Sequence, residues 1–238
     1  MTMLFSSATE RLIAMTADSA VAHDFESHRE YEIGRKRYPF PGIGVVTTWG
    51  SRDGNNVGKY LDEKSLLPGR HSVIDLADFV HEYLTQDYQP RERGLGDVGF
   101  HVAGFDSQQK PRLFHVFWDC NRPNPSDSPP QYEKQDHSPY AGEVPLLYNG
   151  RNDLADIVIR KLISEIEVGT ALRFDLRNPA DQARLGDFIA RFAAELTPEV
   201  GPPFLTSLIF PDNSVDSVVN DTFCPLTVEA IEEKLRRH

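Results

Sequence analysis

The sequence predicts an α+β fold with antiparallel sheets, and the order of the expected elements is the first observation behind this prediction. Strands occur in runs, followed by helices and then strands again, whereas a doubly wound parallel sheet alternates them one by one. The second observation is that short polar turns join several strand pairs, which is typical of β-hairpins. No internal repeat is present, and the 238 residues fit one large domain, 1–238.

The expected strands share short runs of apolar, β-branched or aromatic residues, and they span 3–7, 11–15, 38–49, 98–105, 112–119, 144–148, 204–210 and 214–219. The expected helices span 72–84, 153–166, 179–196 and 227–237. Ser72 is a suitable N-cap for the first helix, and Asn178 before Pro179 suits the start of the third. The segment 121–142 is rich in Pro, Ser and Asp, so we expect a long surface loop there.

Composition excludes several classes of function. The net charge of −11, from 36 acidic and 25 basic residues, argues against a protein that binds nucleic acid or an anionic membrane. Two cysteines, Cys120 and Cys224, are too few for a disulfide framework or a zinc site. No run approaches the ~18 apolar residues needed to cross a bilayer, and the first residues lack the pattern of a secretory signal. We therefore expect a cytoplasmic protein without metal or cofactor.

Residue two is a threonine, and aminopeptidases remove Met1 when the next residue is small. A free N-terminal threonine is a complete small catalytic unit, because its hydroxyl can attack a carbonyl and its own α-amine can accept the proton. The α-amine has a pKa near 7.7–8.0, close to working pH. Composition alone also places threonine at this position by chance, so Thr2 needs support from other residues.

Asp18 and Lys36 offer that support. Asp18 comes at the end of the second expected strand, and in a hairpin opened by Thr2 that end returns to the beginning of the chain. A lysine held by this aspartate would lower the proton affinity of the Thr2 amine and hydroxyl through its positive charge. The alternative is that Asp18 forms a turn and Lys36 is solvated.

Four segments together resemble the proteasome β-subunits and their bacterial relatives. LIAMTADSAVAHD is similar to their second strand, and RKRYPFPGIGVVTTWG is similar to the strand that follows. VGFHVAGFDSQQKPRLFHVFWD resembles their central hairpin, and GPPFLTSLIFPDNSV resembles their closing one. The spacing of Thr2 and Asp18 also matches that of the family's nucleophile and aspartate. The resemblance spans nearly the whole chain.

The resemblance implies an N-terminal-nucleophile (Ntn) hydrolase fold, a four-layer α-β-β-α sandwich. It implies that Thr2 is the nucleophile and that Asp18 and Lys36 support it. A backbone N–H at about Trp49 or Gly50 would form the oxyanion hole. Ala22 lies where the family's main chain binds extended substrate as an added strand.

Two departures from the family pattern concern proton relay. The segment 148–152 contains no serine where the family has Gly-Ser-Gly, and the segment 196–201 lacks the family's Asp and Ser. Arg151 and Glu199 are the candidates to substitute. Two hypotheses remain open: a threonine peptidase or amidohydrolase, or a catalytically impaired subunit that serves as an oligomeric scaffold or assembly partner. The expected partners are a peptide or protein substrate, further copies in a ring-like homo-oligomer and, by analogy, an unfoldase.

Other reactive residues have simpler interpretations. His23 and His28, with the acids between them, fit no common zinc spacing, so a solvated loop is favoured over a metal site. His101 and His115 face each other across the central hairpin if its register is regular, and such pairs are more often structural than catalytic. Cys120 has no obvious basic neighbour, so an inert thiol is favoured over a nucleophile.

Overall fold

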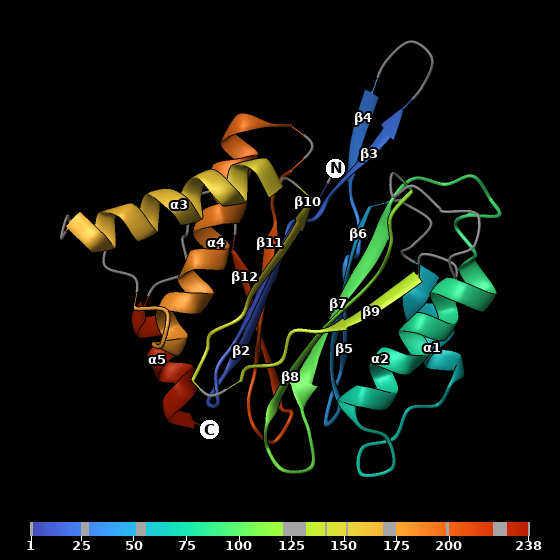
Figure 1. Cartoon of the computed structure of the whole chain (residues 1–238), viewed down its shortest axis with the longest axis horizontal. Helices are drawn as coiled ribbons and strands as arrows, with labels where there is room; N and C mark the ends of the chain where they lie inside the picture. Colours follow the sequence, from blue (N-terminus) through green and yellow to red (C-terminus); the bar gives the residue numbers. More distant parts are fainter. Residues whose placement is uncertain are drawn as a thin grey trace.

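Two five-stranded antiparallel sheets form the centre of the molecule (Figure 1). The computed structural model describes residues 2–24, 29–50, 56–120, 132–140, 142–150, 152–168, 175–198, 200–220 and 228–237. Strand order is β10-β1-β2-β11-β12 in the first sheet and β5-β6-β7-β8-β9 in the second. Neighbouring strands are antiparallel throughout both sheets, which confirms the predicted α+β class.

The first sheet joins the two ends of the chain. Its strands are β1 (Met3–Ala8), β2 (Ile13–Ala17), β10 (Leu146–Gly150), β11 (Phe204–Ile209) and β12 (Val215–Asn220). The second sheet comes from the middle of the chain, with strands β5 (Arg37–Phe40), β6 (Gly44–Gly50), β7 (Val98–Phe105), β8 (Pro111–Trp118) and β9 (Tyr132–Asp136). The hairpins predicted at the start, centre and end of the chain are therefore present.

Some elements were not expected from the sequence. A separate two-stranded sheet pairs β3 (Ala20–Asp24) with β4 (Arg29–Ile33), and it projects from the body of the molecule in Figure 1. The prediction of a loop over 121–142 was wrong for β9, which pairs with β8 at the edge of the sheet. The sequence of β9, YEKQD, has no alternation of apolar and polar residues, because an edge strand is held by backbone hydrogen bonds to one neighbour.

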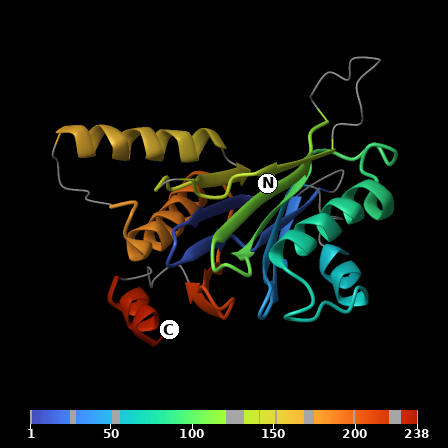
Figure 2. The same ribbon diagram turned by 60° about the horizontal axis from the view of Figure 1, so that its bottom comes forward.

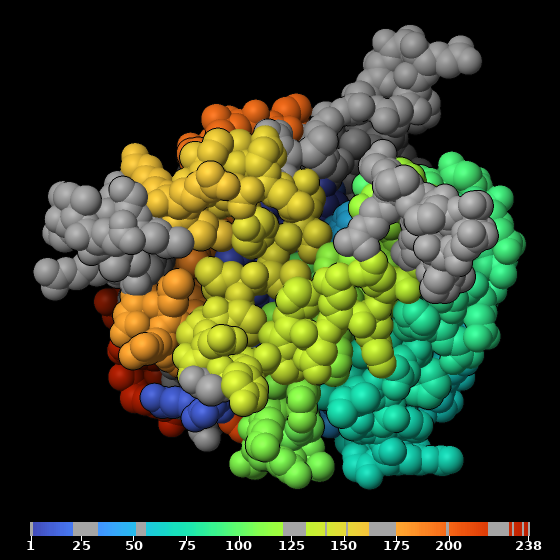
Figure 3. Space-filling model, viewed as in Figure 1, coloured from blue at the N-terminus to red at the C-terminus, as the bar shows by residue number. Residues whose placement is uncertain are grey.

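Helices pack against both sheets. They are α1 (Val57–Glu63), α2 (Val73–Glu82) with the following π-helix η2 (Tyr83–Tyr88), α3 (Asn152–Val168), α4 (Pro179–Leu196) and α5 (Val228–Arg237). Of these, α2 packs against β7 and β8, and α4 packs against β1, β2 and β11. Both predicted caps are confirmed, since Ser72 forms a capping box at α2 and Asn178 caps α4. Figures 1 and 2 show α1 and α2 beside the second sheet and α3 and α4 beside the first. In the space-filling view of Figure 3, the chain from β9 to α3 covers the centre of one face.

The alternation of side chains along each strand divides the interior into an outer and an inner part. On β7, Phe100 and Val102 face α2, whereas His101 and Ala103 face the first sheet. The apolar core between the sheets includes Met15 of β2. Polar side chains that lie on these inner faces must find partners in the opposite sheet, because they are cut off from solvent.

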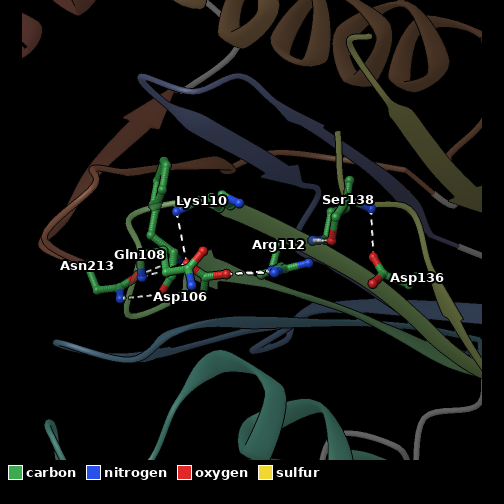
Figure 4. Close-up of polar contacts among 9 residues, drawn as sticks. Asp106, Gln108, Lys110, Arg112, Asp136, Ser138 and Asn213 are labelled. Atoms are coloured by element: carbon green, nitrogen blue, oxygen red, sulfur yellow. Dashed lines mark hydrogen bonds and ion pairs between the residues drawn. The ribbon is translucent and has the colours of Figure 1, made fainter. Parts of the chain in front are cut away.

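The turn between β7 and β8 closes the end of the central hairpin that lies away from Trp118. Asp106 accepts hydrogen bonds from the backbone N–H groups of Gln108 and Lys110, at 2.8 and 3.0 Å, and from Arg112 Nε at 2.9 Å (Figure 4). The Asn213 amide bonds both backbone groups of Phe105 and so ties the turn to the β11–β12 hairpin. The opposite end of the β7–β8 hairpin borders the start of the chain at Thr2.

Candidate active site

A buried ion pair joins the end of β2 to the start of β5. Lys36 Nζ donates to both carboxylate oxygens of Asp18, at 2.9 and 3.0 Å, and the two residues are 4% and 0% exposed. Asp18 follows the last residue of β2, and Lys36 precedes the first residue of β5. The pair therefore connects the two sheets, and the alternative of a solvated lysine is excluded.

Asp18 also binds the start of the chain, next to Thr2. The backbone N–H of Met3 donates to Asp18 Oδ1 at 2.8 Å, and the Asp18 N–H donates to the Met3 carbonyl at 3.2 Å. A further backbone N–H, from Ala20, donates to Oδ2 at 3.1 Å. The carboxylate is thus held by one ammonium group and by backbone donors, an arrangement that suits a buried charge.

Burial shifts the pKa values of both partners toward their neutral forms. Desolvation raises the pKa of the Asp18 carboxyl, and the charge of Lys36 with the hydrogen bonds from Met3 and Lys36 opposes it. Desolvation lowers the pKa of the Lys36 ammonium, and the charge of Asp18 opposes it. These opposing effects act on one buried pair, whose carboxylate accepts a hydrogen bond from the backbone of Met3, the residue after Thr2.

A pocket of about 330 Å³ opens beside Thr2. Its walls come from strands of both sheets and from residues next to the strand ends, and they comprise Thr2, Trp49, Gly50, Asp97, His115, Phe117, Asp119, Asn149, Gly150 and Asn152. Thr2 is buried, at 5% exposure, although it borders this space. The structure therefore brings three of the predicted site residues, Thr2, Trp49 and Gly50, to one cavity.

Gly150 fixes how closely β10 approaches Thr2. Its φ of +104° lies in the region that favours glycine, and a Cβ atom there would lie 1.5 Å from the Thr2 carbonyl oxygen. Gly50, at the opposite wall, has a φ of +90°, and a Cβ atom there would lie 2.1 Å from the Asp97 carbonyl oxygen. At the pocket, β6 and β10 thus each end on a backbone conformation that favours glycine.

The remaining predicted site residues lie elsewhere or outside the described chain. Ala22 lies in β3, where its backbone pairs with Tyr31 of β4. Arg151 and Glu199, the candidates for proton relay, lie outside the described residues. Their proposed roles therefore remain predictions.

Three residues of the site region were not predicted as site residues: Ser6, His101 and Asn149. Ser6 Oγ lies 2.8 Å from His101 Nδ1, and His101 Nε2 lies 2.7 Å from Asn149 Oδ1. The only signals in the sequence were the facing histidines and the position of Asn149 in the segment where a serine was sought. The predicted histidine pair is confirmed, since His101 and His115 are register partners whose ring centroids are 5.4 Å apart.

Of the other candidates, the His23 and His28 site lies outside the part of the chain whose side chains the structure describes. Among the described residues, no group of three or more His, Cys, Asp or Glu side chains is placed to hold a metal ion. Cys120 is exposed, and its hydrogen bond to Asp97 raises the pKa of the thiol, which disfavours the thiolate nucleophile. Of the helices that the structure describes, none is long and apolar enough to cross a membrane.

Sequence comparison provides no relative, because no family model and no curated protein matches the chain. Comparison with solved structures does find similar proteins. Anbu from Pseudomonas aeruginosa, solved as a helical assembly, superposes with a TM-score of 0.67 at 17% identity, covering 99% of this chain and 92% of its own. The chain folds like Anbu. The ancestral beta-subunit Anbu of Yersinia bercovieri gives a TM-score of 0.65 at 15% identity, covering 99% of this chain and 92% of its own.

A third Anbu structure, a Gly-1 mutant from Hyphomicrobium sp. strain MC1, gives a TM-score of 0.66 at 14% identity, covering 100% of this chain and 96% of its own. Anbu proteins are proteasome-like but form a distinct family, so the assignment to the proteasome β-subunits was wrong. The motifs behind that assignment mark strand ends and hairpin turns. Such features follow from the shared fold, and they do not separate one family of this fold from another.

Proposed function

We propose that Thr2 becomes the amino terminus after removal of Met1 and acts as the nucleophile of a hydrolase for peptide or other amide bonds. One observation carries this proposal: Thr2 borders a pocket while its neighbour Met3 is bound by Asp18, which is paired with Lys36. We further propose that the chain is one domain and that its two sheets and outer helices form the four-layer α-β-β-α sandwich of the Ntn hydrolases.

The proposed reaction has two stages. The Thr2 hydroxyl attacks the substrate carbonyl while the Thr2 amine takes its proton, and the amine then gives the proton to the leaving nitrogen as the amide bond breaks. Water attacks the resulting ester in the second stage, and the acid is released. Lys36 keeps positive charge beside the amine and hydroxyl, which lowers the proton affinity of both. A backbone N–H near Gly50 is proposed to hold the oxyanion.

An acylating probe tests this proposal. A β-lactone reacts with a threonine hydroxyl by ring opening, so the intact mass rises by the whole mass of the lactone and peptide mapping locates the ester. We expect a chain without Met1 that is labelled at Thr2, no label in Thr2→Ala, and retained labelling in Thr2→Ser, which keeps a hydroxyl. A purified chain that retains Met1, or equal labelling of Thr2→Ala, would contradict the proposal.

Self-assembly is a second proposal, and it holds whether or not the site is active. The helical assembly of Pseudomonas aeruginosa Anbu, a structure with the same fold, supports it. Light scattering after size exclusion should give a mass of several chains. If Thr2→Ala assembles like the wild type but the wild type is never acylated, the scaffold hypothesis is favoured. The unfoldase partner stays a prediction.

A further inference from the structure

A chain of hydrogen bonds runs between the two sheets and ends at the wall of the Thr2 pocket. It starts at Ser6 on β1, passes through His101 on β7 and ends at Asn149 on β10. Ser6 and His101 are both 0% exposed, whereas Asn149 is half-buried and lines the pocket. The two distances, 2.8 and 2.7 Å, are within the range of well-formed hydrogen bonds.

His101 has one proton to share along this chain. Burial lowers the pKa of the imidazole to about 4, so the ring is neutral near pH 7 and carries a single N–H. The oxygen of the Asn149 amide accepts hydrogen bonds but cannot donate one. The N–H is therefore on Nε2, which faces Asn149, and Nδ1 accepts from the hydroxyl of Ser6.

In the structure, the oxygen of the Asn149 amide is the atom that faces His101. Because its oxygen is bound to His101, its NH2 group is the end left for the pocket that Asn149 shares with Thr2. The next residue, Gly150, pairs with Met3 in the register of β1 and β10 and lies close to the Thr2 carbonyl, so strand pairing holds this end of β10 beside Thr2. A preset amide donor beside a nucleophile is worth more than a mobile one, since its orientation costs nothing during reaction.

We propose that Asn149 is a hydrogen-bond donor of the Thr2 pocket, aimed at the carbonyl group of the bound substrate, and that His101 and Ser6 are its positioning residues. This inference rests on the proposed function, because the donor needs an acyl group at Thr2. Its structural part, the orientation of the amide, does not depend on activity. The two parts can be tested separately.

The first test measures the tautomer of His101 by nitrogen NMR of the imidazole ring. We expect the Nε2–H form in the wild type. In Asn149→Asp, a carboxylate of the same shape faces the ring, so the pKa of His101 should rise from its low value. An Nδ1–H form in the wild type, or a pKa of His101 that does not rise in Asn149→Asp, would overturn the inference.

The second test measures the rate of acylation of Thr2 by the β-lactone. Asn149→Ala and Asn149→Asp both lack the amide donor, and we expect each to react roughly 10²-fold more slowly, as when one oxyanion donor is removed. Tyr148→Phe is the matched control on the same strand, because the Tyr148 hydroxyl bonds Asp156 and lies outside the pocket wall. Its rate should stay at the wild-type value.

Variants of His101 separate positioning from packing. In His101→Gln the new side chain can donate an N–H to Asn149 but cannot titrate, whereas in His101→Leu it fills the space without a hydrogen-bond donor. We expect His101→Gln to acylate within a few-fold of the wild type and His101→Leu to resemble Asn149→Ala. Equal rates in these two variants, or a wild-type rate in Asn149→Asp, would overturn the inference. If the wild type is never acylated, the proposed function fails, and the tautomer of His101 alone decides the orientation of Asn149.

Discussion

The two polar connections between the sheets differ in charge. Near Thr2, Asp18 and Lys36 form a buried ion pair with an N–O distance of 2.9 Å. Deeper between the sheets, Ser6 and His101 form a neutral connection that continues to Asn149. A buried charge loses far more solvation than a buried neutral group, so it depends more strongly on its partner. The difference teaches that removing one partner should cost more in the charged connection, whereas the neutral one can hold the sheets together at a lower cost of desolvation.

Removal of Asp18 should have the largest effect. Asp18→Ala leaves the Lys36 ammonium buried without a carboxylate, and we expect a loss of about 3–5 kcal/mol in the free energy of unfolding, measured by urea denaturation. Replacing both partners by apolar residues, as Asp18→Leu with Lys36→Met, should recover much of that loss while acylation of Thr2 stays low.

The half-exposed pair of Lys64 and Glu82 is the control for this prediction, since its N–O distance of 2.8 Å matches that of the buried pair. Lys64→Ala should cost at most about 1 kcal/mol, because solvent screens the pair. An equal loss in Asp18→Ala and Lys64→Ala would mean that burial adds nothing to the charged connection.

Acid should weaken the neutral connection next. The ordinary pKa of 6.5 falls to about 4 for His101 in the fold, so the unfolded chain binds more protons between these pH values. The stabilisation is thus present above pH ~6.5 and is lost as the pH falls toward 4, by on the order of 3 kcal/mol. Unfolding curves at pH 7, 6 and 5 measure it.

His101→Gln is the control for the acid effect, because its side chain cannot titrate. Its stability should fall less steeply between pH 7 and pH 5 than that of the wild type. Parallel slopes would show that His101 is not held neutral by burial. Burial also lowers the pKa of His115, to about 2, so His115 adds to the loss of stability in acid equally in the wild type and in His101→Gln.

Removal of the Ser6 hydroxyl should have a smaller effect than either change above. Ser6→Ala leaves the buried Nδ1 of His101 without its donor, which costs about 1–3 kcal/mol. The control is Thr47→Val on the inner face of β6, since Thr47 Oγ1 is buried with no hydrogen-bond partner among the described residues. Thr47→Val should be neutral or stabilising in urea denaturation. If it destabilises as much as Ser6→Ala, loss of packing explains both.

The smallest expected effect lies outside both connections, at the N-cap of α2. Ser72→Ala removes the hydroxyl that accepts a hydrogen bond from the Asp75 N–H, and it should lower the free energy of unfolding by about 1 kcal/mol. Acylation of Thr2 should be unchanged, because α2 packs on the face of the second sheet that points away from Thr2. A lower melting temperature without a change in acylation rate would show how large a purely structural loss of stability is.

Much of the fold was predictable because it depends on local pattern. The β1–β2 and β7–β8 hairpins have apolar strands around polar turns, and the caps at Ser72 and Asn178 use side chains beside their own helices. The hairpin β3–β4 and the edge strand β9 were missed because backbone pairing holds them, and their side chains show no periodic pattern.

The sequence by itself determined the class of fold, most of the element positions and the candidates Thr2, Asp18 and Lys36, because strand periodicity, turn chemistry and spacing along the chain are local. The tertiary structure decided the pairing of Asp18 with Lys36, the pocket beside Thr2 and the chain from Ser6 to Asn149. These depend on two sheets meeting face to face, which brings together residues as far apart in the chain as Ser6 and His101, 95 positions, and no local pattern encodes which inner-face groups will meet. The sequence motifs pointed to the wrong family for the same reason, since they record strands and turns that relatives of one fold share.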